Sequence, residues 1–390
     1  MLRKPRNILY IGRFGLPDTA AGLRVFNNAK ILASLGCKVH CLCARYNEQQ
    51  RVDVEDVEYH FVYRTSSGCL SSLGNVFELI FAGRMFQEVK RTVEAHSIDT
   101  IILYNELFAL TCRLVGWCRR HDIRLVSDVT EWYEQPDASA QIIDKVIPYL
   151  TDKRIRLLDA KVHNIIAISP YLSGYYRAKG CNVMFMPPVF DAKLMAAAPM
   201  SGSKPKAVLR LVYTGAPGAN NKDVIEPLLR AVSRVNGDGV KVEFHIVGLA
   251  ERDLGRYVEF DDFAQRGILA YGRVAHERVL DIVRSADFGV LLRRPLRYAK
   301  AGFSTKLAET MMLGVPMLCN RVGGAEMLLE DRIDGYLVDT ADESALIAAL
   351  EQLCGMPNEA LCEMKQAARR KAMELFSLQN YVESMRQFLQ

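Results

Sequence analysis

The feature that most constrains the fold is a regular alternation of short apolar runs with stretches of helical periodicity. The run NILYIG (7–12) is apolar and closed by a glycine, and GLRVFNNAKILASLG (22–36) carries apolar residues at helical spacing up to Gly36. The runs KVHCLCA, VEYHFVY, DTIILYN, RLVSDVTE and NIIAIS follow in the same way. Apolar strands separated by helices are typical of a parallel sheet covered on both faces, so the sequence predicts an α/β fold.

The same alternation restarts in the second half of the chain. It ends with NVMFMPPVFD, and a stretch rich in Ala, Pro, Ser and Gly (196–208) follows. The new strand-like runs are LRLVYTG (209–215), KVEFHIVG (241–248), ILAYGRV (268–274), DFGVLL (287–292), VPMLCN (315–320) and GYLVD (335–339). Since 390 residues are also long for one core, we expect two doubly wound domains that face each other across a cleft. Their ligands should bind at the carboxyl ends of the strands.

Composition and charge narrow the class of protein. The net charge of +5 suits an anionic ligand or membrane surface, is equally ordinary for a globular protein, and is too low for a nucleic-acid-binding protein. No stretch approaches the length of a membrane span, and the N-terminal apolar run is too short for a signal peptide. The ten cysteines form no Cys-x-x-Cys pair, so we expect reduced thiols in a cytoplasmic protein.

The first predicted strand-to-helix turn lacks the known phosphate-binding patterns. Gly12, Gly15 and Gly22 fit neither G-x-G-x-x-G nor the P-loop pattern. A helix from Gly22 would still offer free N–H groups to an anion or hydroxyl. Arg24 in its first turn opposes the helix dipole, which favours a ligand role for this loop over an ordinary connection.

The corresponding turn of the second half has a lysine near a helix start. Gly215 and Gly218 lie in the loop, Asn221 is a candidate helix cap, and Lys222 follows it. A lysine there opposes the dipole unless a phosphate occupies the helix end; the alternative is a solvated side chain.

A run of cations follows the strand at 287–292. No acid interrupts this run, so either an anion lies nearby or the loop is well solvated, and GFST then opens a helix whose N–H groups could join a diphosphate site. The residues predicted to bind the anion are Arg293, Arg294, Arg297, Lys300, Ser304, Thr305 and Lys306.

Glu309 is the one acid of that helix. It lies too far from Ser304 and Thr305 to complete a capping box, and it is not on the apolar stripe of the helix. Its carboxylate could accept two hydrogen bonds from a vicinal diol such as a ribose. A surface ion pair with Lys306 is the alternative.

Acids also follow a strand of the first half, in VSDVTEWYEQP (126–136). Asp128 and Glu131 could bind sugar hydroxyls or act as a base, or could serve as solvated capping acids. No histidine pair has the spacing of metal ligands, so no metal site is predicted.

Several of these runs resemble a known family. YTGAPGANNKD, ADFGVLLRRPLRYAKAGFSTKLAETMMLGVPMLCN and GGAEMLLEDRIDGYLVD are similar to the donor domain of GT-B glycosyltransferases of the retaining family 4 (glycosyltransferase group 1), especially bacterial polysaccharide and lipopolysaccharide enzymes. AAGLRVFNNAKILASLGCKVHCL and SDVTEWYE resemble the first domain more loosely, and FSLQNYVESMRQFL resembles the last helix, which crosses back to that domain.

The resemblance implies a division of the chain. Residues 1–190 would form a Rossmann-like acceptor domain, 191–208 a linker, 209–375 a Rossmann-like donor domain, and 376–390 the returning helix.

The resemblance also implies roles for matching residues. Glu309 would hold the ribose of the donor, Lys222 the diphosphate, and the helix start at Ser304 and Thr305 would face the phosphates. Ala301 stands where the family often has a glutamate that contacts the donor sugar. Ala216 and Pro217 stand where an arginine is frequent, and the basic loop could replace it.

The resulting prediction is a metal-independent glycosyltransferase that needs no cofactor. It would move a sugar from a nucleotide-diphosphate sugar to a glycan or lipid-linked acceptor in polysaccharide or lipopolysaccharide synthesis. The stretch 69–91 could contact an anionic membrane, or could be a core helix. The alternatives are a nucleotide-sugar epimerase, a non-catalytic nucleotide-sugar-binding protein and, least favoured without the glycine fingerprint, an oxidoreductase.

Overall fold

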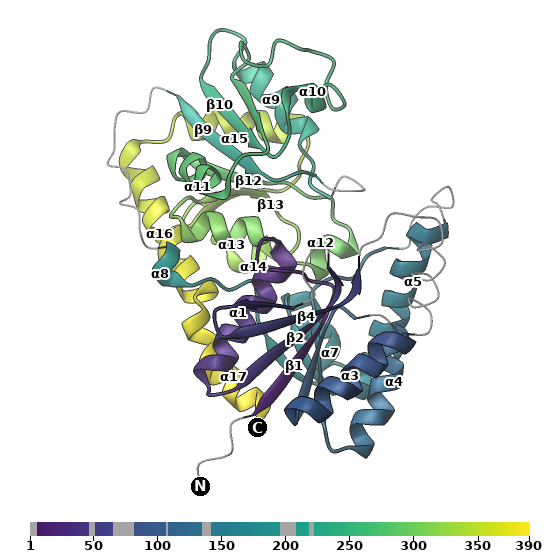
Figure 1. The fold of residues 1–390 in the computed structure, drawn as a ribbon. Helices are drawn as coiled ribbons and strands as arrows, with labels where there is room; N and C mark the ends of the chain where they lie inside the picture. Colours follow the sequence, from purple (N-terminus) through teal and green to yellow (C-terminus); the bar gives the residue numbers. More distant parts are fainter. Residues whose placement is uncertain are drawn as a thin grey trace. The chain divides into compact units, whose positions relative to one another are not determined.

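The structure is a computed structural model that describes seven segments of the chain: residues 6–46, 51–64, 82–106, 108–134, 142–195, 208–217 and 222–390. These residues form two compact units (Figure 1). Unit 1 comprises Met1–Val189, Ala301–Phe303 and Leu378–Gln390, and unit 2 comprises Phe190–Lys300 and Ser304–Ser377. Most of the predicted linker and the predicted features at Cys69, Gly218 and Asn221 lie outside the described residues.

Unit 1 is built on an eight-stranded sheet of order β3-β4-β2-β1-β5-β6-β7-β8. Neighbouring strands are parallel except β3 and β4, which form an antiparallel pair that the sequence pattern did not predict. The strands are β1 (Asn7–Gly12), β2 (Lys38–Tyr46), β3 (Arg51–Val54), β4 (Val57–Arg64), β5 (Thr100–Tyr104), β6 (Arg124–Val129), β7 (Asn164–Ala167) and β8 (Asn182–Phe185).

Helices cover both faces of this sheet. Alternate residues of β1 point to opposite faces, so their contacts show which helices lie on each face. Ile8 and Tyr10 pack with residues of α1 and α17, whereas Leu9 and Ile11 pack with residues of α3 and α4 (Figure 1). The helices of unit 1 are α1 (Ala20–Ser34), α3 (Gly83–His96), α4 (Phe108–Arg120), α5 (Ile142–Leu157), α6 (Asp159–Val162), α7 (Pro170–Arg177), the 3₁₀ turn η1 (Leu378–Tyr381) and α17 (Val382–Leu389).

The start of α1 differs from the sequence prediction. The helix begins at Ala20, not at Gly22, because Thr19 caps it and its Oγ1 accepts a hydrogen bond from the Gly22 N–H at 3.0 Å. The Gly22 N–H is therefore already bonded within the fold. A glycine is required there, since a Cβ atom would lie 1.8 Å from the carbonyl oxygen of Leu16.

Unit 2 contains a six-stranded sheet of order β11-β10-β9-β12-β13-β14, with every neighbouring pair parallel. Its strands are β9 (Leu209–Thr214), β10 (Val242–Val247), β11 (Ile268–Gly272), β12 (Phe288–Leu291), β13 (Met317–Asn320) and β14 (Gly335–Val338). Its helices are α8 (Ala192–Met195), α9 (Glu226–Val235), α10 (Glu251–Leu254), α11 (His276–Ser285), α12 (Arg297–Ala301), α13 (Thr305–Met312), α14 (Ala325–Leu328), α15 (Glu343–Cys354) and α16 (Asn358–Phe376). The predicted α/β class with two parallel sheets is confirmed.

The C-terminal helix α17 belongs to unit 1. Met385, Phe388 and Leu389 join the core on the α1 side of its sheet. Arg124 donates hydrogen bonds to the carbonyl oxygens of Leu389 at 2.9 Å and Phe388 at 2.7 Å. The last turn of the chain is thereby fixed to β6.

Two further predictions concern the described residues as a whole. No helix in these segments is long and apolar enough to cross a membrane. The nine cysteines that lie within them are all free thiols.

Candidate functional site

The carboxyl edge of the unit 2 sheet gathers most of the residues predicted to bind a donor. Gly215 follows β9 with a φ of +92°, which glycine adopts without strain. A Cβ atom at this position would lie 3.0 Å from Cε of Lys306, so the glycine also leaves room for that lysine. The first turn of α13 therefore lies directly beside the end of β9.

A buried carboxylate organises this edge. Asp223 is 4% exposed and accepts hydrogen bonds from Nζ of Lys306 at 2.5 Å and from Nε of Arg293 at 3.0 Å. The hydroxyl of Tyr213, on β9, donates to the same carboxylate at 2.9 Å. Asp223, Lys306, Arg293 and Tyr213 form what we call the Asp223 cluster.

The Asp223 cluster carries more positive than negative charge. Burial alone would raise the pKa of Asp223, but Lys306 and Arg293 outweigh it and hold the pKa below its usual value. Two cations then share one carboxylate, and their side chains keep 23% (Lys306) and 15% (Arg293) exposure. The cluster is therefore an electropositive group that an anion can reach from solvent.

The basic loop after β12 is held in place by side chains of other strands and loops. The amide of Asn320, the last residue of β13, bonds both the N–H of Arg293 at 2.8 Å and its carbonyl oxygen at 2.7 Å. The hydroxyl of Tyr298 donates to the carbonyl oxygen of Lys222 at 2.6 Å, which joins α12 to the segment before α9. Arg294 and Lys300 are exposed on this loop, and Arg297 is half-buried.

The N-terminus of α13 offers unpaired groups. The helix that GFST was expected to open has Ser304 as its N-cap residue, but the Ser304 side chain makes no capping hydrogen bond. It is 6% exposed, and among the described residues its hydroxyl has no hydrogen-bond partner. The hydroxyl and the first N–H groups of the helix, at Thr305 and Lys306, are thus available to a bound anion.

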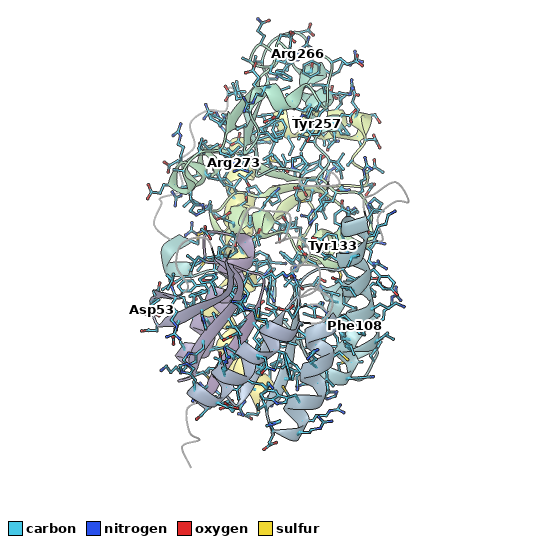
Figure 2. The ribbon with its side chains drawn as sticks, turned by 45° about the vertical axis from the view of Figure 1, so that its right-hand side comes forward. Asp53, Phe108, Tyr133, Tyr257, Arg266 and Arg273 are labelled. Carbon is cyan, nitrogen blue, oxygen red and sulfur yellow. The ribbon has the colours of Figure 1, made fainter. Side chains whose placement is uncertain are left out.

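Glu309 lies one turn further along α13. Lys306 binds Asp223, so the ion pair between Lys306 and Glu309 that was the alternative reading is not formed. Glu309 is 26% exposed, and Nε2 of His276 lies 3.9 Å from its Oε1, too far for a hydrogen bond. His276 opens α11, three residues after Arg273, which Figure 2 labels in the loop that follows β11.

The pKa of Glu309 reflects the burial of its carboxyl group. Burial raises the pKa of the carboxyl above its usual value, and His276 only partly offsets the effect. Within the described segments no donor bonds this half-buried carboxylate, and such a group is costly unless a ligand supplies a donor. The position of Glu309 therefore suits a ligand with neighbouring hydroxyl groups.

In unit 1, the predicted residues Arg24 and Asp128 bind each other. Nη2 of Arg24 lies 2.7 Å from Oδ1 of Asp128, and the two residues are 4% and 0% exposed. The hydroxyl of Tyr10 donates to Asp128 at 2.6 Å, and Nη1 of Arg24 donates to the carbonyl oxygen of Met186 at 3.0 Å. This arrangement favours a structural role for the pair over the predicted catalytic and ligand roles, which stay predictions.

The other predicted residues of unit 1 are less enclosed. Glu131 is exposed just beyond the carboxyl end of β6. Gly15 has a φ of +71° in the loop between β1 and α1, and a Cβ atom there would meet nothing within 4 Å. Glu131 is more exposed than Glu134, the next acid after β6, so a solvent-borne acceptor can reach it more readily.

Sequence reasoning missed three members of the unit 2 site. Asp223 directly follows the predicted Lys222, but the sequence does not show that two cations 70 and 83 positions away share its carboxylate. Tyr213 lies inside the predicted strand LRLVYTG and His276 lies just beyond the predicted strand ILAYGRV, and no pattern marks either as a site residue. These contacts depend on the strand order β11-β10-β9-β12, which brings the carboxyl ends of these strands to one edge of the sheet.

A large part of unit 2 is similar to a known protein family. Residues 209–355 match the family described as "Glycosyl transferases group 1". This match spans β9 to the end of α15 and contains every residue of the Asp223 cluster and Glu309. A comparison with curated proteins found no match.

Solved structures share the fold over nearly the whole chain. A sucrose-phosphate synthase from Thermosynechococcus elongatus superposes with a TM-score of 0.74 at 18% identity, covering 98% of each chain. A glycosyltransferase from Rickettsia africae gives a TM-score of 0.70 at 12% identity, covering 99% of this chain and 98% of that one. HepE from Anabaena, solved with UDP-glucose, gives 0.64 at 14% identity, covering 98% of this chain and 99% of that one.

Proposed function

We propose that this protein, a GT-B glycosyltransferase with a group 1 domain at residues 209–355, transfers a sugar from a nucleotide-diphosphate donor to an acceptor hydroxyl. The observation that carries the proposal is the pairing, on the single helix α13, of an electropositive N-terminus with the half-buried carboxylate of Glu309. A diphosphate and a ribose of one nucleotide would occupy these two places.

The diphosphate would bind at the start of α13. The N–H groups of Thr305 and Lys306, the hydroxyl of Ser304 and the surplus charge of the Asp223 cluster all lie at this edge. Lys222 would add a cation from the segment before α9, and Arg294, Arg297 and Lys300 would attract the donor from solvent. Gly215 would let the phosphates approach the backbone.

The chemistry follows from where charge develops. When the bond between the sugar and the diphosphate breaks, negative charge grows on the leaving diphosphate. The acceptor oxygen forms the new bond to the sugar, and its proton passes to an oxygen of the leaving diphosphate. Cations and N–H groups that are already in place stabilise this charge without reorganisation. Transfer without a metal cofactor and with retained configuration are parts of the proposal.

The structural neighbours support a nucleotide-sugar donor. The Anabaena protein HepE is described in complex with UDP, with UDP and glucose, and with UDP-glucose. We propose the same class of donor for this chain, because the groups that would hold a diphosphate and a ribose are present on its own α13.

The acceptor and the place where it is used are a further part of the proposal. We propose a glycan or lipid-linked acceptor of cell-surface polysaccharide synthesis, used by a cytoplasmic enzyme in peripheral contact with anionic lipid. Of the stretch 69–91, the described part lies mainly in α3, which turns Met85 and Val89 into the core. Its cations Arg84, Lys90 and Arg91 would have to carry the contact, and vesicle flotation without binding to anionic lipid would refute it.

A thermal-shift screen of nucleotide sugars tests the donor proposal. We expect one nucleotide series to raise the melting temperature through binding to the folded state. Glu309→Gln should weaken the ribonucleotide by about tenfold, the size of one charge-assisted hydrogen bond, and should leave the 2′,3′-dideoxy analogue unchanged. Glu351→Gln, an exposed carboxylate of α15, is the matched control.

Three outcomes would count against the proposal. The donor site is refuted if no nucleotide sugar stabilises the protein. Consumption of the donor without an acceptor would indicate an epimerase. Tight donor binding with no turnover of any acceptor would indicate a binding protein.

A further inference from the structure

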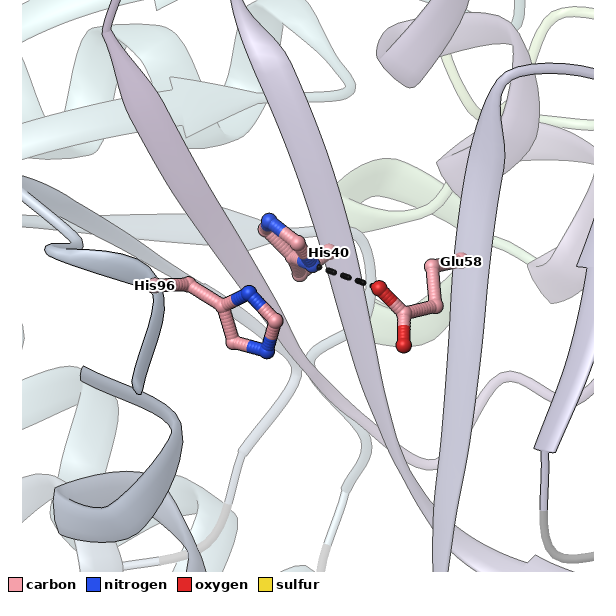
Figure 3. A group of neighbouring side chains, drawn as sticks. All are labelled: His40, Glu58 and His96. Carbon is pink, nitrogen blue, oxygen red and sulfur yellow. Dashed lines mark hydrogen bonds and ion pairs between the residues drawn. The ribbon is translucent and has the colours of Figure 1, made fainter. Parts of the chain in front are cut away.

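We propose that unit 1 binds a zinc ion between β2, β4 and the end of α3. His40 on β2, Glu58 on β4 and His96, the last residue of α3, each direct a ligand atom toward the others (Figure 3). These three atoms all lie within 4.8 Å of one another. We call this group the His40 cluster.

Local structure places the first two ligands. His40 and Glu58 are register partners on the neighbouring parallel strands β2 and β4, so their side chains leave the same face of the sheet. Nδ1 of His40 lies 3.1 Å from Oε2 of Glu58. This pair is fixed by the sheet and needs no rearrangement to share an ion.

The third ligand comes from the helix that covers this face. The imidazole rings of His96 and His40 lie 4.0 Å apart between centroids, with an angle of 37° between their planes. Ligands of a tetrahedral zinc ion at 2.0–2.2 Å stand about 3.3 Å apart, a separation that the His40–Glu58 pair already has within a few tenths of an ångström. The ligand atom of His96 lies within 4.8 Å of the other two, and its half-buried ring would have to turn and shift away from the His40 ring to complete the site.

The chemistry of the donor set favours zinc over the hard cations. Two imidazoles and one carboxylate are a zinc ligand set, whereas calcium and magnesium prefer oxygen ligands throughout. The cluster lines a cavity of about 180 Å³, which leaves room for a water molecule as the fourth ligand. His60 and Glu88 line the same cavity and can hold that water.

The burial of His40 gives an independent reason for a ligand. His40 is 4% exposed, and its Nε2 has no hydrogen-bond partner among the described residues. A buried imidazole with an unpaired nitrogen stabilises a fold poorly compared with an apolar residue of the same size. Zinc bound through Nδ1 would leave Nε2 as an N–H group, and a water molecule of the cavity would have to accept its hydrogen bond.

Two cations also line the cavity, so an anion is the main alternative to zinc as its ligand. Arg91 is paired with Glu88 at 2.7 Å, and Arg51 lies exposed on the edge strand β3. Glu58 would repel an anion at the centre of the His40 cluster, whereas it would complete the coordination of a cation. The observations therefore favour zinc over phosphate.

The position of the cluster indicates what the ion would do. His40 is the third residue of β2 and Glu58 the second of β4, so the cluster lies toward the amino ends of these strands. The donor proposal concerns the carboxyl edge of a different sheet, so the ion would not take part in transfer. It would tie the end of α3 to the sheet of unit 1.

Zinc titration of the full-length, untagged protein tests the proposal. Cys112→Ser is used as the background, because Cys112 is an exposed thiol that could bind zinc by itself. We expect one zinc ion per chain by calorimetry, a higher melting temperature with zinc, and visible absorption of a tetrahedral site with Co²⁺.

Variants separate the His40 cluster from adventitious binding. His96→Gln and Glu58→Gln remove ligands that are not fully buried, so both should fold, and each should weaken zinc by at least about tenfold. His121→Gln, an exposed histidine of the same unit, should leave the affinity unchanged. Unchanged affinity in both ligand variants, no stabilisation by zinc, or stabilisation by phosphate in its place would overturn the proposal.

Discussion

The two units contain similar buried groups of side chains, but the groups differ in net charge and in exposure to solvent. In unit 1, Tyr10 on the strand β1 donates to Asp128, which also binds Arg24. In unit 2, Tyr213 on β9 donates to Asp223, which also binds Arg293. Each is a tyrosine of the first strand, a buried aspartate and an arginine.

The difference lies in charge balance and access. The pair in unit 1 is one cation to one anion, at 4% and 0% exposure. In unit 2 Lys306 is added as a second cation, and both cations keep some exposure. A balanced and closed pair holds elements together, whereas an unbalanced and accessible one can also bind an anion. Substitutions in the two arrangements should therefore separate stability from binding.

The largest effect is expected from Asp128→Asn. The change leaves the Arg24 charge buried without its partner, which costs about 3–5 kcal/mol of the free energy of unfolding. Urea unfolding followed by circular dichroism measures the loss. Asp223→Asn should cost clearly less, because Arg293 and Lys306 can turn to solvent; equal costs would show that the two arrangements do not differ in this way.

The next largest effect is expected on donor binding from Lys306→Met. Removing one charge-assisted contact should weaken a nucleoside diphosphate by at least about tenfold, with little loss of stability because Arg293 still pairs with Asp223. Arg294→Gln, an exposed cation of the same loop, should weaken it by only about threefold. Calorimetry measures both affinities, and a larger loss for Arg294 would place the anion on the loop instead.

The smallest effect is expected on stability from Glu309→Gln. Since burial raises the pKa of Glu309, its contribution to stability is full below the ordinary carboxyl pKa and is lost as the pH rises through the raised value. The variant should therefore be about 0.5–1 kcal/mol more stable than the native protein at neutral pH, and no more stable in acid. Melting temperatures across this pH range check the sign, and a loss of stability at neutral pH would contradict it.

Much of the fold was predictable because it depends on local patterns. The run NILYIG is β1 with the predicted bounds, and the helix expected to open at GFST is α13. The start of α1 was wrong by two residues because the hydroxyl of Thr19 supplies a cap that the apolar spacing does not show. The antiparallel β3 was missed because its exposed, short pattern carries little signal.

The candidate sites were less predictable because they depend on contacts between distant positions. The basic loop pointed to an anion, but not to Asp223 as the group that orders it. His40, Glu58 and His96 have no ligand spacing in the sequence, and only the pairing of β2 with β4 and the packing of α3 bring them together. Such groups depend on which strands and helices are neighbours, and a single sequence predicts these neighbours only in part.

The return of α17 to unit 1 has a consequence for synthesis on the ribosome. The surface that covers Ile8 and Tyr10 includes Met385 and Phe388. Arg124 donates hydrogen bonds to carbonyl oxygens of the last turn of α17, so these bonds form only when α17 is present. Because α17 follows unit 2 in the sequence, unit 1 can be completed only after unit 2 has been synthesised. Until then its unfinished face exposes apolar side chains, and this interval is when a chaperone would be of most use to the nascent chain.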